Sequence, residues 1–402
     1  MKEQISRAIR LVSSRVSTRA LRTRNAPLGV ITVSDKAQPR HSKPPPLALT
    51  YPPYGASVSR STTTQGFPSP VTRIRLWLVT VGLALTGCAG PFPQSTLHPR
   101  SDFAQATDSL FTDIFWWAAA VFVLVELMLV VALVRFRHRE GRPAPKPAHG
   151  HTLMEIAWTL APAVILVFVA VPTVRTIFTS SGEAPADALK VEVIGHQWWW
   201  EFRYLDLALT TANELHLPVG KPVRIGITSA DVIHSFWAPL LGGKRDAIPG
   251  QTNYIAFRAH SIGDYSGQCA EFCGASHANM RLRVIVESDT AFGAWAQHQL
   301  GPSATPPKAS LAEQGKAIYA RSACIGCHMI QGVSPGMIGP NLSHVASRTT
   351  IASGLFANDS AHLAQWIADA PAMKPGSIMT RMKPPLTDAD VAALVAYLQS
   401  LK

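Results

Sequence analysis

Two thiols, a carboxylate, an imidazole and a thioether fall within about a dozen residues of the stretch S-G-Q-C-A-E-F-C-G-A-S-H-A-N-M, Ser266 to Met280. Soft sulfur beside imidazole is what copper selects, whereas magnesium and calcium prefer oxygen ligands. A one-copper site of this kind uses one Cys, one His and a weak Met, with a second His from elsewhere. Because a second Cys follows four residues after the first, the stretch leaves room for two coppers bridged by thiolates, and it predicts electron transfer.

A second chemical motif is C-I-G-C-H at Cys324–His328, which has the C-x-x-C-H spacing of c-type haem attachment. Both thiols would form thioethers and His328 would bind the iron. The alternatives are a chance match and a redox-active C-x-x-C. Haem attachment is favoured because the motif lies in a helical module of about ninety residues on an exported chain, and cytochrome c maturation requires export. The second axial ligand should be a Met before the last helix, where Met373, Met379 and Met382 compete.

The copper stretch also needs a His from upstream. His234, in D-V-I-H-S-F-W-A-P, is the best candidate because it ends an apolar strand and precedes a Pro turn. Taken alone, a single His at such a place is more often a hydrogen-bonded core residue than a ligand.

Composition directs attention to the membrane. The 402 residues allow two or three domains, and a hydrophobic fraction of 47% is high for a soluble protein. The net charge of +12 lies largely in residues 1–75 and in the loop after Val134, so it does not indicate nucleic-acid binding. The five cysteines have spacings that give each a separate role, so no disulfide framework is expected.

The N-terminal part has the features of an export signal. Residues 1–70 are rich in Arg, Ser, Thr and Pro, which predicts a disordered tail or a mis-assigned start. Residues 71–87 read as a signal peptide, with a charged start, the apolar run Leu76–Leu85 and then L-T-G-C. This resembles a lipobox and predicts cleavage after Gly87 and acylation of Cys88; the alternative is an uncleaved anchor.

Residues 88–187 predict a periplasmic segment and a transmembrane hairpin, with helices at about 112–134 and 155–178. The loop between the helices holds four Arg and one Lys against one Glu, which places it in the cytoplasm. The hairpin then crosses a bacterial inner membrane, and everything after about Ser180 lies on its extracytoplasmic side.

Residues 188–300 predict an all-β domain. The run from Leu189 to Tyr204 alternates as strands do, which would put His196, Trp198, Trp200, Phe202 and Tyr204 on one side if no bulge intervenes. Short strand-like runs at Val223–Thr228, Tyr254–Arg258 and Leu282–Val286 suggest a Greek-key barrel or sandwich.

After a Pro-rich linker at 301–309, residues 310–402 predict an all-α domain. Ser310 with Glu313 has capping-box spacing. Thr387, with Asp388 and Asp390, begins the last helix.

Several of these motifs resemble one family. The segments H-S-F-W, L-G-G-K-R-D-A-I-P-G, C-x-E-x-C-G-x-x-H-x-x-M and G-H-Q-W-W-W resemble subunit II of haem–copper cytochrome c oxidases, from about Ile114 to Val286. The resemblance implies a transmembrane hairpin, a cupredoxin-like barrel and a fused class I cytochrome c domain. It also implies a binuclear CuA centre in which Cys269 and Cys273 bridge both metals. The other ligands would be His234, His277, Met280 and the backbone carbonyl of Glu271.

The resemblance implies further roles. The Glu271 side chain would reach a magnesium ion at the interface with subunit I, and Trp198 would receive the electrons that enter CuA. Glu155 matches a carboxylate at the mouth of a proton path, with a solvated flanking charge as the alternative. K-P-G-S-I-M resembles the ligand loop of the fused cytochrome domain and selects Met379; Thr380 stands where that loop usually has Pro, which leaves Met382 open.

The expected function is therefore that of subunit II of a proton-pumping, caa-type cytochrome c oxidase. Electrons from cytochrome c or another donor would pass from haem c to CuA and then to haem a of subunit I, where oxygen is reduced. Subunit I, subunit III and membrane lipid are the expected partners. The alternatives are a nitrous oxide reductase-like CuA protein and a non-catalytic copper-binding assembly protein; a quinol oxidase subunit would lack the copper ligands.

Overall fold

The computed structural model describes residues 92–137, 140–141, 149–180, 184–379 and 385–402, with isolated positions between 72 and 82. The chain divides into two units, Met1–Leu85 and Thr86–Lys402, and the fold described below belongs to the second. The predicted tail 1–70, most of the predicted signal 71–87, Cys88 and Met382 lie outside the described residues.

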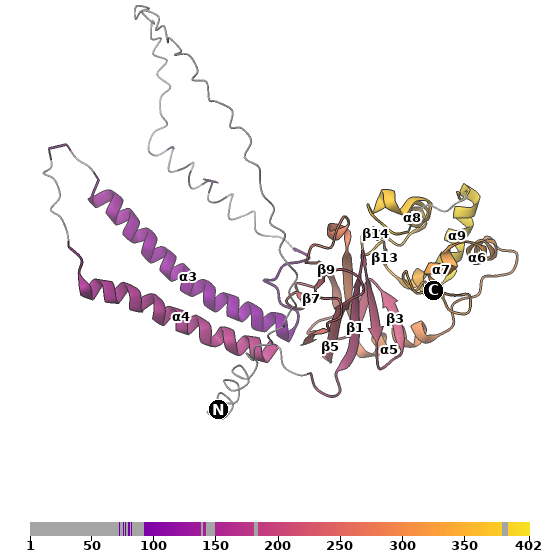
Figure 1. Cartoon of the computed structure of the whole chain (residues 1–402), viewed down its shortest axis with the longest axis horizontal. Coiled ribbons are helices and arrows are strands. Elements are labelled where there is room, and N and C mark those ends of the chain that lie inside the picture. Colours follow the sequence, from indigo (N-terminus) through magenta and orange to yellow (C-terminus); the bar gives the residue numbers. More distant parts are fainter. Residues whose placement is uncertain are drawn as a thin grey trace, which may run out of the picture. The chain divides into compact units, whose positions relative to one another are not determined.

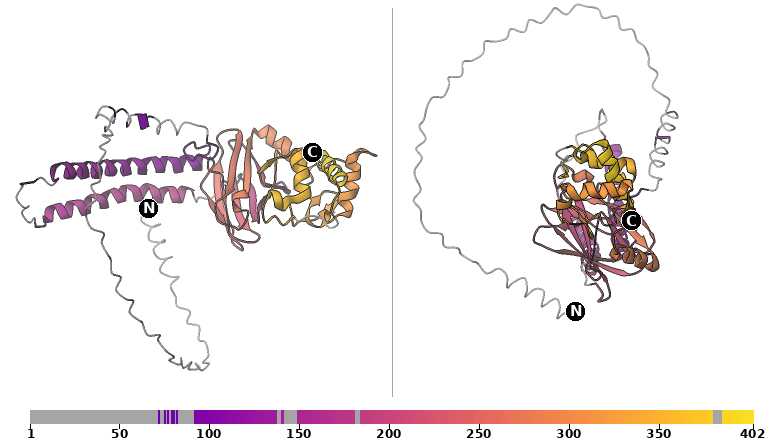
Figure 2. Two further views of the ribbon diagram at one scale, coloured as in Figure 1. Left: turned by 90° about the horizontal axis from the view of Figure 1, so that it is seen from above. Right: turned by 90° about the vertical axis from the view of Figure 1, so that its right-hand side faces the viewer.

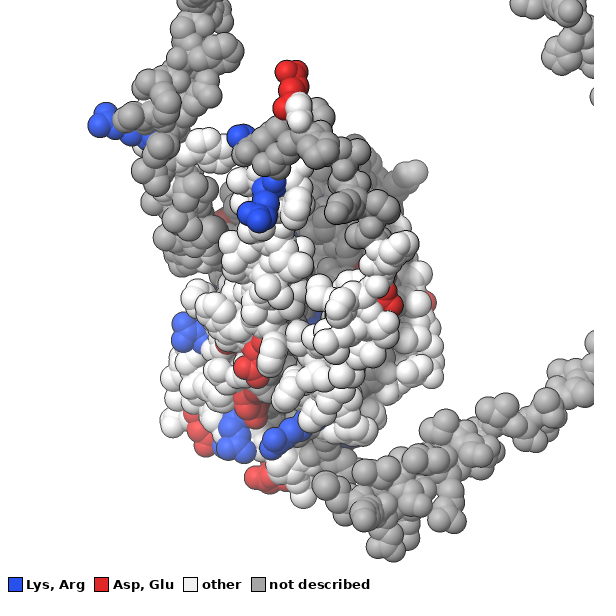
Figure 3. Space-filling view, turned by 90° about the vertical axis from the view of Figure 1, so that its left-hand side faces the viewer, with Lys and Arg blue, Asp and Glu red and all other residues white. Residues whose placement is uncertain are grey.

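Two long helices, α3 (Asp102–Arg135) and α4 (Thr152–Ser180), form a hairpin and lie side by side (Figures 1 and 2). Both are long and apolar enough to cross a bilayer, and neither apolar stretch is buried inside the described structure. The rings of Trp117 and Phe168 stack across the hairpin with centroids 5.7 Å apart. Seen from the hairpin's side, the surface is mostly uncharged with few, scattered charges (Figure 3).

The first helix begins earlier than its apolar run. The sequence predicts a start near residue 112, where the apolar residues begin, but α3 starts at Asp102. Ser101 caps this end, because its hydroxyl accepts a hydrogen bond from the Ala104 amide at 3.0 Å. The same hydroxyl donates to the Leu241 carbonyl, so the helix start is joined to the β domain.

The β domain is a sandwich of two five-stranded sheets (Figure 1). The first sheet has the order β3-β2-β1-β5-β8, with strands β1 (Leu189–His196), β2 (Trp199–Tyr204), β3 (Leu209–Ala212), β5 (Pro222–Ser229) and β8 (Asn253–Arg258). The second has the order β4-β10-β9-β6-β7, with strands β4 (Glu214–Pro218), β6 (His234–Trp237), β7 (Arg245–Ala247), β9 (Gly263–Cys269) and β10 (Arg281–Glu287). β1 pairs in parallel with β5, and β10 with β4, so crossing connections close the sandwich.

The predicted placement of Trp198 is wrong. The alternating run Leu189–Tyr204 is a hairpin in the structure, because β1 ends at His196 and β2 begins at Trp199. Trp200, Phe202 and Tyr204 still point into the core and are at most 1% exposed. Trp198 instead lies in the turn, where its indole and the neighbouring Gln197 amide bind another loop; these tertiary contacts override the period-two pattern.

A helix that the sequence pattern did not predict, α5 (Asp289–Leu300), follows β10 and buries Phe292 and Ala296. Its N-cap is Ser288, whose hydroxyl accepts a hydrogen bond from the Ala291 amide at 3.1 Å. The β domain therefore ends in a helix that packs under the sandwich.

The C-terminal part is helical, as predicted, with α6 (Leu311–Arg321), α7 (Cys324–Cys327), α8 (Ser360–Met373) and α9 (Asp388–Ser400). Short pairs and turns connect them: β11 (Met329–Ile330) with β12 (Ser334–Pro335), β13 (Thr350–Ile351) with β14 (Phe356–Ala357), and η2 (Val345–Ser347). The expected caps are confirmed at Ser310 and Thr387. Helix α6 meets α9 closely at Gly315, where a Cβ would lie 1.9 Å from the Ala393 carbonyl oxygen.

Candidate metal and haem sites

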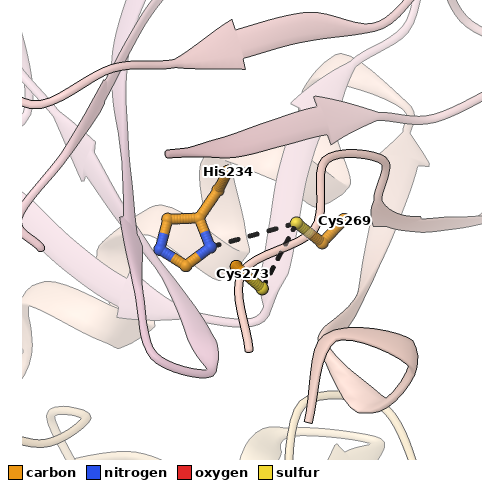
Figure 4. Close-up of side chains that lie close together, drawn as sticks. All are labelled: His234, Cys269 and Cys273. Atoms are coloured by element: carbon orange, nitrogen blue, oxygen red, sulfur yellow. Dashed lines mark hydrogen bonds between the residues drawn. The ribbon is translucent and has the colours of Figure 1, made fainter. Parts of the chain in front are cut away.

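The two thiols of the copper stretch lie together under the sandwich surface. Cys269 ends β9 and Cys273 lies in the following loop, and their Sγ atoms are 3.8 Å apart. Both residues are at most 4% exposed. Figure 4 shows the pair with His234, whose ring points at Cys269. The ligand atoms of these three residues all lie within 4.8 Å of one another, which is close enough for a shared metal site.

One histidine lies beside each thiol. His234, the first residue of β6, is fully buried, and its Nδ1 lies 3.9 Å from Cys269 Sγ. Its Nε2 donates to Asp231 Oδ1 at 2.7 Å, which fixes the ring and leaves Nδ1 free to bind metal. His277 begins η1 (His277–Asn279), and its Nδ1 lies 3.5 Å from Cys273 Sγ. His234 is buried like an ordinary core histidine, but its Nδ1 faces the Cys269 sulfur, which favours a role as ligand.

The weaker predicted ligands are also in place. Met280 is fully buried with its Sδ 3.9 Å from Cys273 Sγ, and the Glu271 carbonyl oxygen lies 3.3 Å from Cys269 Sγ. The Glu271 side chain belongs to an exposed residue. Two thiolates, two imidazoles, a thioether and a carbonyl form a soft donor set that fits copper and does not fit a hard cation.

The hydrogen bond between the two thiols shifts their pKa values in opposite directions. The hydrogen bond from Cys273, assisted by His234, lowers the pKa of Cys269 to about 3, while the same hydrogen bond and burial raise the pKa of Cys273. Burial lowers the pKa of His234, but the hydrogen bonds to Asp231 and Cys269 outweigh it, so the net shift is upward. These shifts favour the thiolate, which is the metal-binding form of cysteine, at Cys269.

Trp198 lies against the thiol loop. Its indole Nε1 donates to the Cys273 carbonyl at 2.9 Å, and Gln197 Nε2 donates to the same oxygen at 2.8 Å. The indole is thus joined by one hydrogen bond to the backbone of Cys273, the residue that carries one of the two thiols. It is partly buried rather than fully exposed.

The C-x-x-C-H motif presents its groups for haem attachment. Cys324 and Cys327 are free thiols at the ends of α7, one partly buried and the other exposed. The Nδ1 of His328 donates to the Pro340 carbonyl at 2.8 Å, which leaves Nε2 as the ligand atom. Burial lowers the pKa of His328, so the ring stays neutral and can bind a metal. Gly339 is required beside this ring, because a Cβ there would lie 2.6 Å from His328 Cε1. These features fit a covalently bound haem.

The remaining predicted site residues lie elsewhere. Met379 is partly buried in the loop after α8, whereas its rival Met382 lies outside the described residues. Glu155 is exposed in the first turn of α4 and does not join the thiol cluster.

Sequence reasoning missed three side chains around these sites. Asp231 orients His234, and its spacing of three residues from that ligand was a usable signal. Glu214 and Lys374 are charged but only 1% and 3% exposed, and both bind across the interface between the β domain and the helical domain. No local pattern indicates these contacts, because the partners across the interface are more than a hundred residues away along the chain.

Taken together, an apolar hairpin, a cupredoxin-like sandwich with a sulfur–imidazole cluster and a helical domain with C-x-x-C-H define a membrane-anchored redox protein. Profile comparisons agree with this class. The transmembrane domain of cytochrome c oxidase subunit II matches residues 97–176, its periplasmic domain matches residues 207–288, and cytochrome c matches residues 312–402.

Relatives match most of the chain. Cytochrome c oxidase subunit 2 of Alkalihalophilus pseudofirmus is 35% identical over 327 residues, covering 80% of this chain and 94% of that protein. The Bacillus subtilis subunit 2 is 33% identical and covers 82% and 98%. A crystal structure of the periplasmic domain of subunit II from Bradyrhizobium japonicum is 34% identical and covers 30% of this chain and 96% of that one, with a TM-score of 0.28. The chain belongs to the cytochrome c oxidase subunit 2 family and is a component of a terminal oxidase. The predicted family and fold class are thereby confirmed.

Proposed function

We propose that this chain relays electrons from a donor, cytochrome c or another carrier, to haem a of subunit I in a proton-pumping cytochrome c oxidase. It holds haem c on Cys324, Cys327 and His328, with Met379 as second axial ligand, and it holds two coppers on the thiol loop. When bound, the haem and the copper pair supply reversible one-electron carriage at nearly fixed geometry. Oxygen is reduced in subunit I and not in this chain.

The carrying observation is that the two redox motifs occur in one membrane-anchored chain and that the copper motif forms a buried cluster. The ligand atoms of His234, Cys269 and Cys273 lie within 4.8 Å of one another, and C-I-G-C-H opens the following domain. A nitrous oxide reductase-like protein has less use for the apolar hairpin, and a copper-binding assembly protein has none for a covalent haem.

Each side chain has a defined task in this proposal. Cys269, Cys273, His234 and His277 would hold the two coppers, and Met280 and the Glu271 carbonyl would be weaker ligands. Since so many of these groups are buried and held by hydrogen bonds, little rearranges when an electron arrives. Trp198 donates a hydrogen bond to the Cys273 carbonyl, which makes its indole the proposed point of electron arrival at the copper ligands.

Two further roles concern the complex. The exposed Glu271 side chain is the proposed contribution to a magnesium site shared with subunit I. Glu155, exposed at the start of α4, is the proposed carboxylate at a proton path. The hairpin spans the bacterial inner membrane beside subunits I and III, among lipid, and both redox domains are periplasmic. Cys88 is the proposed lipid attachment point.

The order of electron transfer tests this function. In the purified oxidase complex, mixing with a reduced donor should reduce the haem first and the copper centre second, before oxygen consumption becomes steady. Cys324→Ala with Cys327→Ala should remove the haem phase and slow copper reduction by cytochrome c. Copper reduction that precedes haem reduction, or is unaffected by the substitutions, would refute the proposed route.

A further inference from the structure

Two buried charges lie where the helical domain meets the sandwich. We call residues 188–300 the copper domain and residues 310–402 the haem domain. Glu214, at the start of β4 in the copper domain, is 1% exposed, and Lys374, after α8 in the haem domain, is 3% exposed. Charged side chains are rarely buried this deeply unless they are fully hydrogen-bonded, so each calls for a specific explanation.

The Glu214 carboxylate binds one short segment of the haem domain. Its Oε1 accepts from the Thr349 amide at 2.9 Å, the Thr349 hydroxyl at 2.6 Å, the Thr350 amide at 2.8 Å and the Thr350 hydroxyl at 2.9 Å. Oε2 accepts a further bond from the Thr349 amide at 3.1 Å. The strand neighbour of Glu214, Arg283, instead donates to Asp264, so the carboxylate depends on the haem domain for its donors.

The Lys374 ammonium connects the two domains from the other side, because a residue of the haem domain here binds the copper domain. Its Nζ donates to the Trp198 carbonyl at 2.5 Å, to Ser353 Oγ at 2.9 Å and to the Ala352 carbonyl at 3.3 Å. A lysine has three N–H donors, and here all three have an acceptor. No ion pair with a carboxylate is found for Lys374 among the described residues, so backbone and hydroxyl oxygens alone stabilise it.

The Trp198 carbonyl also accepts from Ser353 Oγ at 2.8 Å, and the haem domain covers the indole itself. A Cβ added at Gly376 would lie 2.8 Å from Trp198 Cη2 and 3.2 Å from Ala275 Cβ. Next to it, the Ser276 hydroxyl donates to the Pro375 carbonyl. The surface around Trp198 is therefore occupied by the loop that precedes Met379.

We propose that Glu214 and Lys374 are positioning residues that hold the haem domain on the Trp198 surface, so that the chain's own haem domain, and no external donor, delivers electrons there. This inference rests on the proposed function, in which the haem of this chain passes electrons to the copper centre. Buried polar contacts of this kind specify one orientation, because any other would remove all the donors of Glu214 and the Trp198 acceptor of Lys374. An external donor would then reach the copper centre only through the haem domain.

The test uses the whole oxidase complex with Glu214→Gln and Lys374→Met, each made alone. Glutamine cannot accept the four donors that meet at Oε1, and methionine removes the ammonium at similar length. Glu192→Gln, on β1 of the copper domain and paired with Arg203 at 3.4 Å, is the matched control. The first readout is hydrogen exchange in the segment 349–353, and the second is the rate of electron transfer from photoreduced haem to copper.

Either variant should exchange faster at 349–353 while α6 and α9 keep their protection, and should transfer electrons about tenfold or more slowly. In Glu214→Gln the copper spectrum and both midpoint potentials should stay unchanged, and in either variant reduction of copper by an external donor should become measurable. Wild-type exchange and transfer rates in both variants would overturn the inference. If the unsubstituted complex showed no haem-to-copper transfer, the proposed function would fail, while exchange would still decide whether these residues dock the domain.

Discussion

Among the single residues, Asp231 shows how a ligand is prepared by a neighbour that does not bind metal. Its carboxylate accepts from His234 Nε2 at 2.7 Å and from the Gln197 amide at 2.6 Å. Burial raises the pKa of Asp231, but these hydrogen bonds outweigh it and the net shift is downward, so the carboxylate is ionised at neutral pH. A charged acceptor on the far nitrogen holds the imidazole with Nδ1 toward the thiols.

Asp231→Asn should therefore weaken copper binding without removing a ligand. The expected loss of copper affinity is about 10–100-fold, the usual effect of removing such a hydrogen-bond partner. Copper content during competition with a chelator measures it, and the haem content of the same preparation serves as the internal control. Unchanged copper retention would show that the backbone alone orients His234.

The axial ligand of the haem is the second prediction for a single side chain. Met379→Ala should lower the haem midpoint potential and abolish the absorption band of methionine-bound iron, because methionine ligation raises the potential. Met382→Ala is the matched comparison and should leave both unchanged. Potentiometric titration followed at the haem bands separates the two, and the reverse result would assign the ligand to Met382.

The candidate ligands that the structure brings together could be picked out from the sequence because most of them are local. C-x-E-x-C-G-x-x-H-x-x-M places Cys269, Cys273, His277 and Met280 on one loop, and only His234 comes from another strand. Asp231 was equally local but was not predicted, since its contribution depends on which nitrogen of the imidazole faces the metal site. Glu214 and Lys374 had no comparable signal, because their contacts exist only once the two domains meet.

Among helices and strands, the hydrophobic pattern predicted the bounds of strands that bury one face. It failed where contacts with a distant segment determine the local structure. Strands β5, β8 and β10 fall on the predicted runs to within a residue or so. The strand-like run continues across Gln197 and Trp198, yet the chain turns there and both side chains bind the thiol loop. Helix α5 was overlooked because Gly293 and short polar residues weaken its amphipathic pattern.

The packing of α5 on β4 makes stability depend on pH. His216 of β4 stacks on Trp295 of α5 at 4.1 Å, and its Nδ1 lies 3.0 Å from Glu287 Oε2. Burial lowers the pKa of His216, and Glu287 only partly opposes this, so the net shift is downward from 6.5. The folded chain then binds fewer protons than the unfolded chain, and this contribution is complete above about pH 6.5 and is lost as the pH falls through the lower folded pKa.

Thermal unfolding of the detergent-solubilised chain, measured from about pH 7.5 to about pH 5, tests the direction of this pH dependence, because histidine usually titrates in that range. The midpoint of the unsubstituted chain should fall more steeply below pH 6.5 than that of His216→Gln, which cannot titrate. Parallel curves for the two proteins would contradict a linkage through His216.

Across the whole molecule, the order of the domains along the chain matches the proposed order of electron movement in reverse. The hairpin anchors the chain, the copper domain follows, and the haem domain comes last and covers Trp198. Hydropathy, loop charge and two short motifs were sufficient to predict this arrangement of domains. The docking of one domain on the other could not be predicted, because it depends on a few buried contacts between distant segments.

The account depends most on the claim that the thiol loop of Cys269 and Cys273 holds two coppers rather than one. Electron paramagnetic resonance of the purified, oxidised complex, combined with metal analysis of the same sample, tests this directly. We predict two coppers per chain in this loop and a hyperfine pattern from one unpaired electron shared by two equivalent copper nuclei. A pattern from a single copper nucleus, with one copper bound by His234, one cysteine and His277, would contradict the account.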